Sequence, residues 1–326
     1  MIKGISGLKN TIAINKNAIL IAAKLLIAAG LIYYIVNVID YNKILLAIEE
    51  ANLTIIGIVT LLGVINIFLQ FSKWKLTCTE VLGESDQLKV FRSLFYGFSA
   101  GIITPLRVGE YFGRGIEFKE KSLLQVTLAT LVDKFFPLLM VASFGAVSSL
   151  LFIYFYYGVS VYLVLSLFIL IFTLLYLLIS LMMSKRFWNN ILFSRISSSA
   201  RLKAFLNKLR VFENLDRIYF YKMLLISFLF YSCFLIQYAL LVMAFSNHYN
   251  FLDYLWAANL IMFVKTIIPP VSLGELGIRE GASIYFLTQM GETAAIGFNA
   301  SIMLFVINLL IPALIGVGMF LRKNGN

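Results

Sequence analysis

Two short stretches of the chain hold most of the residues whose chemistry is unusual for their surroundings. Both follow the pattern P-x-x-[V/L]-G-E-x-x-x-R, once from Pro105 and once from Pro270. The charged residues of these stretches and their flanks are Arg107, Glu110, Arg114, Lys265, Glu275, Arg279 and Glu280. Guanidinium and ammonium groups bind phosphate oxygens through charge and forked N–H donors, so this set predicts a binding site for an anionic group.

In both copies the glutamate lies four residues before the arginine. On a helix that begins after the glycine, Glu110 and Arg114 would share one face, as would Glu275 and Arg279. Such a helix start would also offer free backbone amides to an anion. Two interpretations stay open: each pair only neutralises itself and holds the segment, or its arginine binds a ligand.

Proline and glycine interrupt the helical pattern inside both stretches. The residues expected to break the backbone are Pro105, Gly109, Pro269, Pro270, Gly274 and Gly277. At membrane depth, a broken backbone is tolerated only where protein or a water-filled cavity satisfies the freed N–H and C=O groups. We therefore expect both breaks to face the interior.

A third charged site is Asp133 with Lys134, close to Pro137 in an otherwise apolar run. An ionisable pair within a span is either a proton-relay site or a pair at the cytoplasmic edge of a tilted helix. We favour the edge.

The elements that position these residues must be membrane helices. Of 326 residues, 61% are hydrophobic and 13% are charged, which excludes an ordinary soluble domain. The one histidine, His248, leaves no metal centre or Ser/His/Asp arrangement, and Cys78 and Cys233 form no zinc motif. We expect an all-α integral membrane protein without a cofactor, a metal or enzymatic activity.

Hydropathy predicts about six full spans and two re-entrant hairpins. The spans are 18–38, 53–71, 124–153, 162–183, 223–245 and 294–321, and the hairpins are 91–121 and 255–289.

The two hairpins also resemble each other in sequence. Residues 98–114 aligned on 263–279 give seven identities in seventeen positions without a gap. Three spans separate the copies, so the repeats are inverted, a pattern that marks the substrate site in many transporter folds. The single membrane domain 1–326 then divides into repeats 18–153 and 162–321.

Basic residues set the orientation. Segments 1–17, 72–92, 114–123, 184–222 and 322–326, counted as loops on one side, hold 21 Lys and Arg. The other side holds only Lys43, which predicts an inner-membrane protein with both termini in the cytoplasm. The same basic residues account for the net charge of +11, so we do not expect a nucleic-acid partner. The basic loop 184–222 has amphipathic helical spacing, so it either lies on anionic headgroups or only sets the topology.

The segments FSAGIITPLRVGEYFGR and IIPPVSLGELGIREG resemble the lysylphosphatidylglycerol synthase transmembrane family, a flippase-like domain found alone or fused to a lipid aminoacyltransferase. The resemblance implies translocation of an aminoacylated phosphatidylglycerol, a polyprenyl-linked lipid or another headgroup-modified lipid. The chain ends at Asn326, soon after the last span, so we expect a stand-alone member without the transferase domain.

These observations predict a flippase or scramblase for an anionic or headgroup-modified phospholipid. With no nucleotide-binding motif, movement would be downhill or driven by an ion gradient, with Glu110, Glu275 or Asp133 as proton carriers. The alternatives are a secondary transporter of small anions, a membrane enzyme on lipid headgroups, and a structural scaffold. The expected partners are anionic membrane lipids, with a second copy of the chain and a separate lipid-modifying enzyme also compatible with the sequence.

Overall fold

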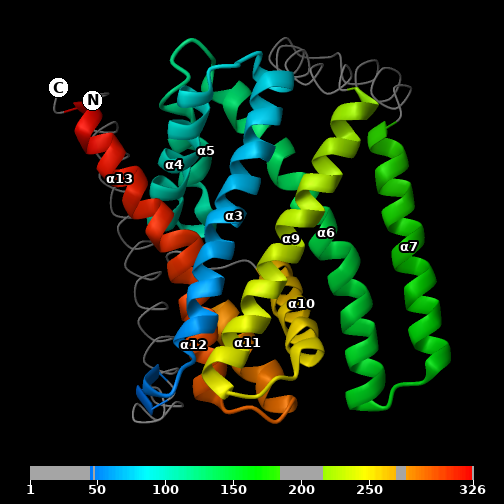
Figure 1. The fold of residues 1–326 in the computed structure, drawn as a ribbon. Helices are drawn as coiled ribbons and strands as arrows, with labels where there is room; N and C mark the ends of the chain where they lie inside the picture. Colours follow the sequence, from blue (N-terminus) through cyan, green and yellow to red (C-terminus); the bar gives the residue numbers. More distant parts are fainter. Residues whose placement is uncertain (1–44, 47, 184–215, 269–276, 325–326) are drawn as a thin grey trace, which may run out of the picture.

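The computed structural model describes residues 45–46, 48–183, 216–268 and 277–324. All regular structure in this part of the chain is helical, which confirms the predicted all-α class (Figure 1). The predicted span 18–38, most of the basic loop 184–222, and Pro269, Pro270, Gly274 and Glu275 lie outside the described residues.

Four helical segments are long and apolar enough to cross a membrane: Leu53–Leu82, Leu123–Tyr157, Arg217–Ser246 and Ala294–Arg322. The first is helix α3 (Leu53–Thr77) followed by the π-helical turn Cys78–Leu82. The second and third are α6 (Leu123–Tyr157) and α9 (Arg217–Ser246). The fourth is α12 (Ala294–Phe305), which continues through the π-helical turn Val306–Leu310 into α13 (Ile311–Asn324). Helix α7 (Val161–Met183) is a further apolar helix beside α6 (Figure 1). These helices match the predicted spans 53–71, 124–153, 162–183, 223–245 and 294–321.

Side-chain caps start several of these helices where the sequence turns apolar. Asn52 accepts hydrogen bonds from the amides of Thr54 and Ile55 at the start of α3. Ser122 and Gln125 form a capping box at the start of α6. At about 1.5 Å per residue, the 35 residues of α6 extend over roughly 50 Å, which exceeds the hydrocarbon thickness.

Each predicted hairpin contains two shorter helices. The first holds α4 (Gln87–Ile103), the 3-10 turn Pro105–Arg107 and α5 (Gly109–Gly115). Helix α4 ends at Ile103 because Thr104 is extended, and in the turn that follows Leu106 and Arg107 have left-handed φ angles of 55° and 53°. The second holds α10 (Phe251–Ile267) and α11 (Ile278–Gln289).

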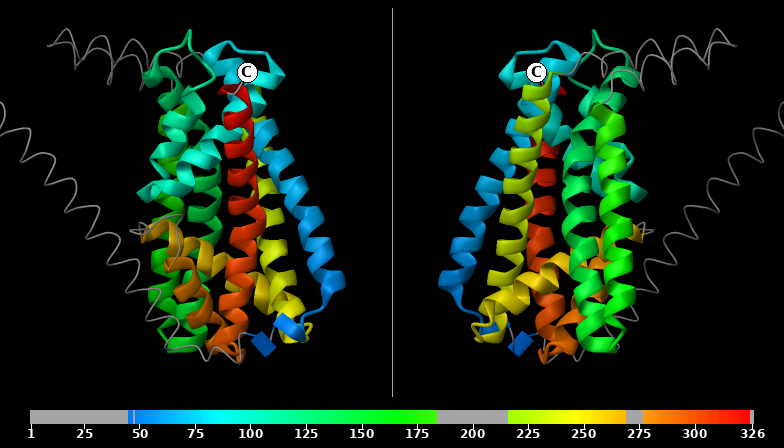
Figure 2. Two further views of the ribbon diagram at one scale, coloured as in Figure 1. Left: turned by 90° about the vertical axis from the view of Figure 1, so that its left-hand side faces the viewer. Right: turned by 90° about the vertical axis from the view of Figure 1, so that its right-hand side faces the viewer.

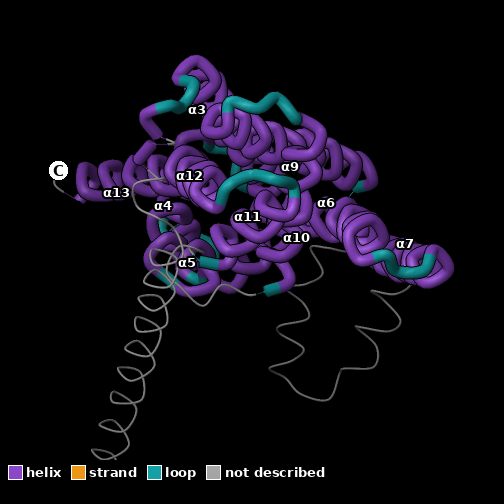
Figure 3. The backbone as a smooth tube through the Cα atoms, turned by 90° about the horizontal axis from the view of Figure 1, so that it is seen from below, coloured by secondary structure: helices purple, strands orange, loops and turns teal. Residues whose placement is uncertain are grey.

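The two helix pairs enter the bundle from opposite ends. In Figures 1 and 2, α4 and α5 lie in the half where α3 ends, and α10 and α11 lie in the half where α3 begins. The four short helices pack against the long helices, as the view along the bundle shows (Figure 3). The division into two inverted repeats with the boundaries given above stays a prediction.

Close packing holds the first pair in place. A Cβ on Gly109 would overlap the carbonyl oxygen of Ala100, so α5 approaches the backbone of α4 more closely than any larger residue allows. Helix α13 closes on α4 in the same way, and Ser99 Oγ donates to the Ala313 carbonyl at 2.7 Å. The turn between α4 and α5 is thereby fixed beside the long helices.

Candidate functional site

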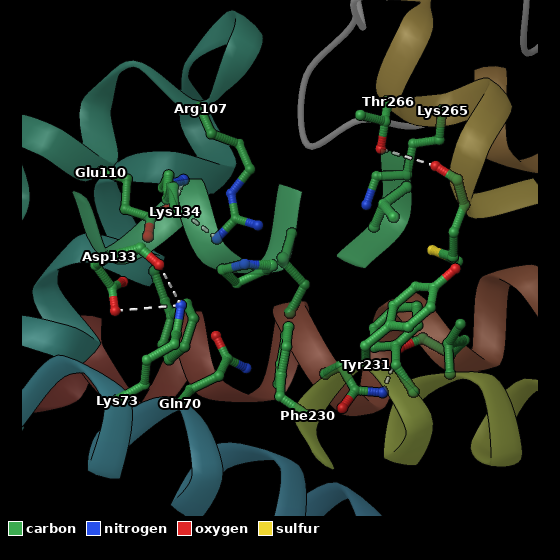
Figure 4. A pocket seen from close by; sticks show the side chains of 18 of the residues that line it. Gln70, Lys73, Arg107, Glu110, Asp133, Lys134, Phe230, Tyr231, Lys265 and Thr266 are labelled. Atoms are coloured by element: carbon green, nitrogen blue, oxygen red, sulfur yellow. Dashed lines mark hydrogen bonds and ion pairs between the residues drawn. The ribbon is translucent and has the colours of Figure 1, made fainter. Parts of the chain in front are cut away.

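A cavity of about 210 Å³ lies between the two helix pairs. Its lining comes from α3, α4, α5, α6, α9, α10, α11 and the α12–α13 helix. Figure 4 shows a cluster of charged side chains on one side and Lys265 and Thr266 on the other, with Phe230 and Tyr231 of α9 between them.

Glu110 is the centre of the charged cluster. Its Oε1 accepts from Arg114 Nη2 at 2.7 Å, which is the four-residue pair expected from the sequence. Its Oε2 lies 2.6 Å from Lys134 Nζ and 2.9 Å from Arg107 Nη2. One carboxylate that is 2% exposed therefore contacts three cations.

Asp133 is the second carboxylate of the cluster. Its Oδ2 accepts from Arg114 Nη1 at 2.9 Å, and its Oδ1 lies 3.2 Å from Lys73 Nζ. Lys73 also donates to the backbone carbonyl of Asp133 at 2.8 Å. Arg114 thus bridges the two carboxylates, and its guanidinium lies 4.2 Å from the ring centroid of Trp74, a cation–π contact.

The second helix pair contributes a smaller network. Arg279 Nη2 donates to Glu280 Oε1 at 2.6 Å, and Arg279 Nε donates to Ser301 Oγ on α12 at 2.9 Å. The amide of Gly277 donates to Glu280 Oε2 at 2.6 Å. Both charged side chains are at most 2% exposed, and Arg279 also lines the cavity.

Cationic side chains outnumber carboxylates around the cavity in the described part of the chain. Among the described residues, six cations face three carboxylates: Lys73, Arg107, Arg114, Lys134, Lys265 and Arg279 against Glu110, Asp133 and Glu280. Phe230, Phe234 and Met262 are among the apolar residues of the wall. Six cationic side chains around one low-dielectric pocket favour an anionic group.

The structure brings together most of the predicted site residues. One cavity is lined by Arg107, Glu110, Arg114, Asp133, Lys134, Lys265 and Arg279. Glu280 forms an ion pair with Arg279. The expected pairing of Arg279 with Glu275 cannot be compared, because Glu275 lies outside the described residues. The partner that the structure shows for Arg279 is its neighbour, Glu280.

Three expectations are corrected. Asp133 and Lys134 do not pair with each other: Asp133 is 1% exposed and contacts Lys73 and Arg114, while Lys134 contacts Glu110. The amide of Gly109 is not free for an anion, because it donates to Thr104 Oγ1 at 2.7 Å.

The third correction concerns the loop boundaries. Lys73 and Arg114, which we counted among the basic loop residues, are instead buried in α3 and α5. Among the charged residues that line the cavity in the described part of the chain, Lys73 is the one that sequence reasoning missed. The apolar periodicity that continues through Trp74 into the π-helical turn was the signal that α3 runs past residue 71.

A comparison with protein families shows which family the chain belongs to. Residues 21–316 match the family described as lysylphosphatidylglycerol synthase TM region. The chain belongs to this family. No curated protein matches it significantly. Membership agrees with a multi-pass membrane protein that is related to lipid handling, and the match includes every residue of the cavity.

Proposed function

We propose that this protein moves an anionic or headgroup-modified phospholipid, or a polyprenyl-linked lipid, between the two leaflets. The gathering of six cationic side chains around one cavity, within the part of the chain that the structure describes, carries this proposal. A phosphate satisfies such a site, because guanidinium and ammonium groups donate to its oxygens. Family membership supports a lipid as the source of that phosphate.

We propose a transport role rather than catalysis on the headgroup. Glu110 contacts three cations and Asp133 contacts two, so both carboxylates serve to neutralise neighbouring charges. A general acid or base would need a carboxyl group directed at a substrate. Proton coupling through Glu110 or Asp133 stays a prediction, as do self-association and a separate lipid-modifying partner enzyme.

We further propose that the end of the bundle carrying the α4–α5 pair faces the cytoplasm. The described helix ends and the 116–122 loop there carry Lys75, Lys89, Lys119, Lys121 and Arg322. At the other end the described loops 48–52, 158–160, 246–250 and 290–293 contain acidic residues and no Lys or Arg. The positive-inside rule then places the first end in the cytoplasm of a cell with an inner membrane.

Cysteine labelling tests this orientation. In intact cells a membrane-impermeant maleimide should label Tyr249→Cys, whose side chain is 68% exposed in the α9–α10 loop, and should not label Lys119→Cys. Cys78 and Cys233 are buried, so they contribute little background. The reverse labelling pattern would overturn the proposed orientation.

Leaflet exchange in vesicles tests the transport proposal. The purified protein is reconstituted with fluorescent phospholipids of anionic, zwitterionic and aminoacylated headgroups, and dithionite quenching reports the lipid that reaches the outer leaflet. We expect protein-dependent exchange that depends on the headgroup. Arg107→Gln removes one cation from the cavity and should slow exchange by about tenfold, the cost of one charge-assisted hydrogen bond.

Lys119→Gln is the matched control, because Lys119 is exposed on the 116–122 loop and does not line the cavity. Exchange at the protein-free rate for every headgroup would reject translocation. Uptake of free phosphate into the same vesicles without lipid exchange would instead identify a small-anion transporter.

A further inference from the structure

Two surface grooves follow the boundary between α6 and α9. One, of about 490 Å³, lies between Leu139–Phe144 of α6 and Tyr221–Phe228 of α9. The other, of about 300 Å³, is bounded by α6, α9 and α10. Both include Phe144 and Phe228, so the two grooves adjoin along the bundle, and we call them together the α6–α9 groove.

This groove borders the charged cavity through one side chain. Tyr231 lines both the cavity and the groove and is only 4% exposed. Its ring stacks on Phe144 at a centroid distance of 6.0 Å, and its hydroxyl donates to Asn259 Oδ1 on α10. Tyr231 is therefore the wall between the charged interior and the groove.

The groove is apolar along most of its length and open to the side. Leu225 is 59% exposed and Phe228 is 43% exposed, so within the described residues they present hydrocarbon to the membrane. Its polar groups gather beside Tyr231, where the Asn259 amide donates to Ser148 Oγ and to the Phe144 carbonyl. A polar patch next to the cavity and an apolar remainder match a molecule with one polar end and a long apolar tail.

The cavity is too small for a whole lipid, so the acyl chains need a neighbouring space. At about 210 Å³ the cavity is below the range of sites that enclose a drug-sized ligand, so it holds a headgroup and excludes two acyl chains. Drawing a chain past Lys73, Arg107 and Lys134 would also place hydrocarbon against charged groups that it cannot satisfy.

We propose, on the basis of the transport function above, that the α6–α9 groove holds an acyl chain of the lipid whose headgroup occupies the charged cavity. The lipid then straddles Tyr231, with the polar patch of Ser148 and Asn259 receiving the headgroup when it leaves the cavity. The occupant is a membrane lipid. Two outcomes would oppose this assignment: a helix of a second protein copy in the groove, or lipid contact no greater in the groove than elsewhere on the membrane-facing surface.

Filling the groove tests the proposal. Ser143 and Ser232 line the two parts of the groove and not the cavity, so Ser143→Trp and Ser232→Trp should obstruct the chain without touching the charged cluster. We expect both variants to lose protein-dependent leaflet exchange. Leu229→Trp is the control, because Leu229 is 46% exposed on α9 and lines neither space.

The possible results separate the two proposals. If the unmodified protein exchanges no lipid, the transport function fails. If it exchanges lipid and both tryptophan variants do so at the same rate, the groove assignment is overturned and the transport function stands.

Photo-crosslinking gives a readout that does not depend on activity or on tolerance of tryptophan. A benzophenone amino acid replaces Leu225 in the full chain, and Leu163 of α7, 52% exposed, serves as the control position. The protein is reconstituted with a radiolabelled anionic phospholipid, and we expect more lipid adduct at position 225. Equal labelling at both positions, or a crosslinked protein dimer, would overturn the proposal.

Discussion

The contact between Lys73 and Asp133 makes a quantitative prediction about stability. Their charged atoms are 3.2 Å apart and both side chains are almost fully buried, which at an effective dielectric of about 20 corresponds to about 5 kcal/mol of attraction. Desolvation offsets much of that attraction while the pair is intact. Removing one partner therefore leaves the other as a buried charge without its counter-ion, which lowers the free energy of unfolding.

The two single substitutions should have unequal effects. Asp133→Asn leaves Lys73 without a carboxylate at hydrogen-bond distance and should lower the free energy of unfolding by about 3–5 kcal/mol. Lys73→Met leaves Asp133 still bound to Arg114 at 2.9 Å, so it should cost only about 1.5–3 kcal/mol. The double variant should be more stable than Asp133→Asn alone, because no stranded ammonium group remains.

Unfolding in mixed micelles with increasing denaturing detergent measures these free energies. Lys75→Met is the control, because Lys75 lies two residues away on α3 and is only half-buried; its cost should stay within about 0.5 kcal/mol. Equal costs for the two single variants, with a double variant that is simply additive, would refute the reasoning.

Two further variants test the packing of the hairpins. Gly109→Ala should lower the free energy of unfolding by about 1–3 kcal/mol, because its Cβ would overlap the Ala100 carbonyl. Gly318→Ala is the control and should be neutral, because Gly318 has open space around it. A neutral Gly109→Ala would contradict the close approach of α4 and α5. Ser301→Ala should cost about 1–3 kcal/mol in the same assay, because it leaves Arg279 Nε buried without its acceptor, and Ser301→Thr should restore most of the loss; equal losses in both would show that the hydrogen bond is not the cause.

Local patterns in the sequence were sufficient to predict the described long helices, the first helix break and one ion pair. Runs of apolar residues located the described long helices, because a segment that crosses lipid must satisfy its own backbone hydrogen bonds. Proline and glycine located the break between Ile103 and Gly109. The Glu110–Arg114 pair followed from spacing alone, since a helix places positions four apart on one face.

Contacts between distant segments were decided only by the tertiary structure. The pairing of Lys73 with Asp133 joins residues 60 positions apart and depends on the rotation and height of two separate helices, which hydropathy does not specify. The same holds for Arg279, whose contacts with Ser301 and Glu280 depend on how α11 begins and packs on α12. The cavity and the groove beside Tyr231 also exist only once these helices are assembled, because no single segment contains more than one of their walls.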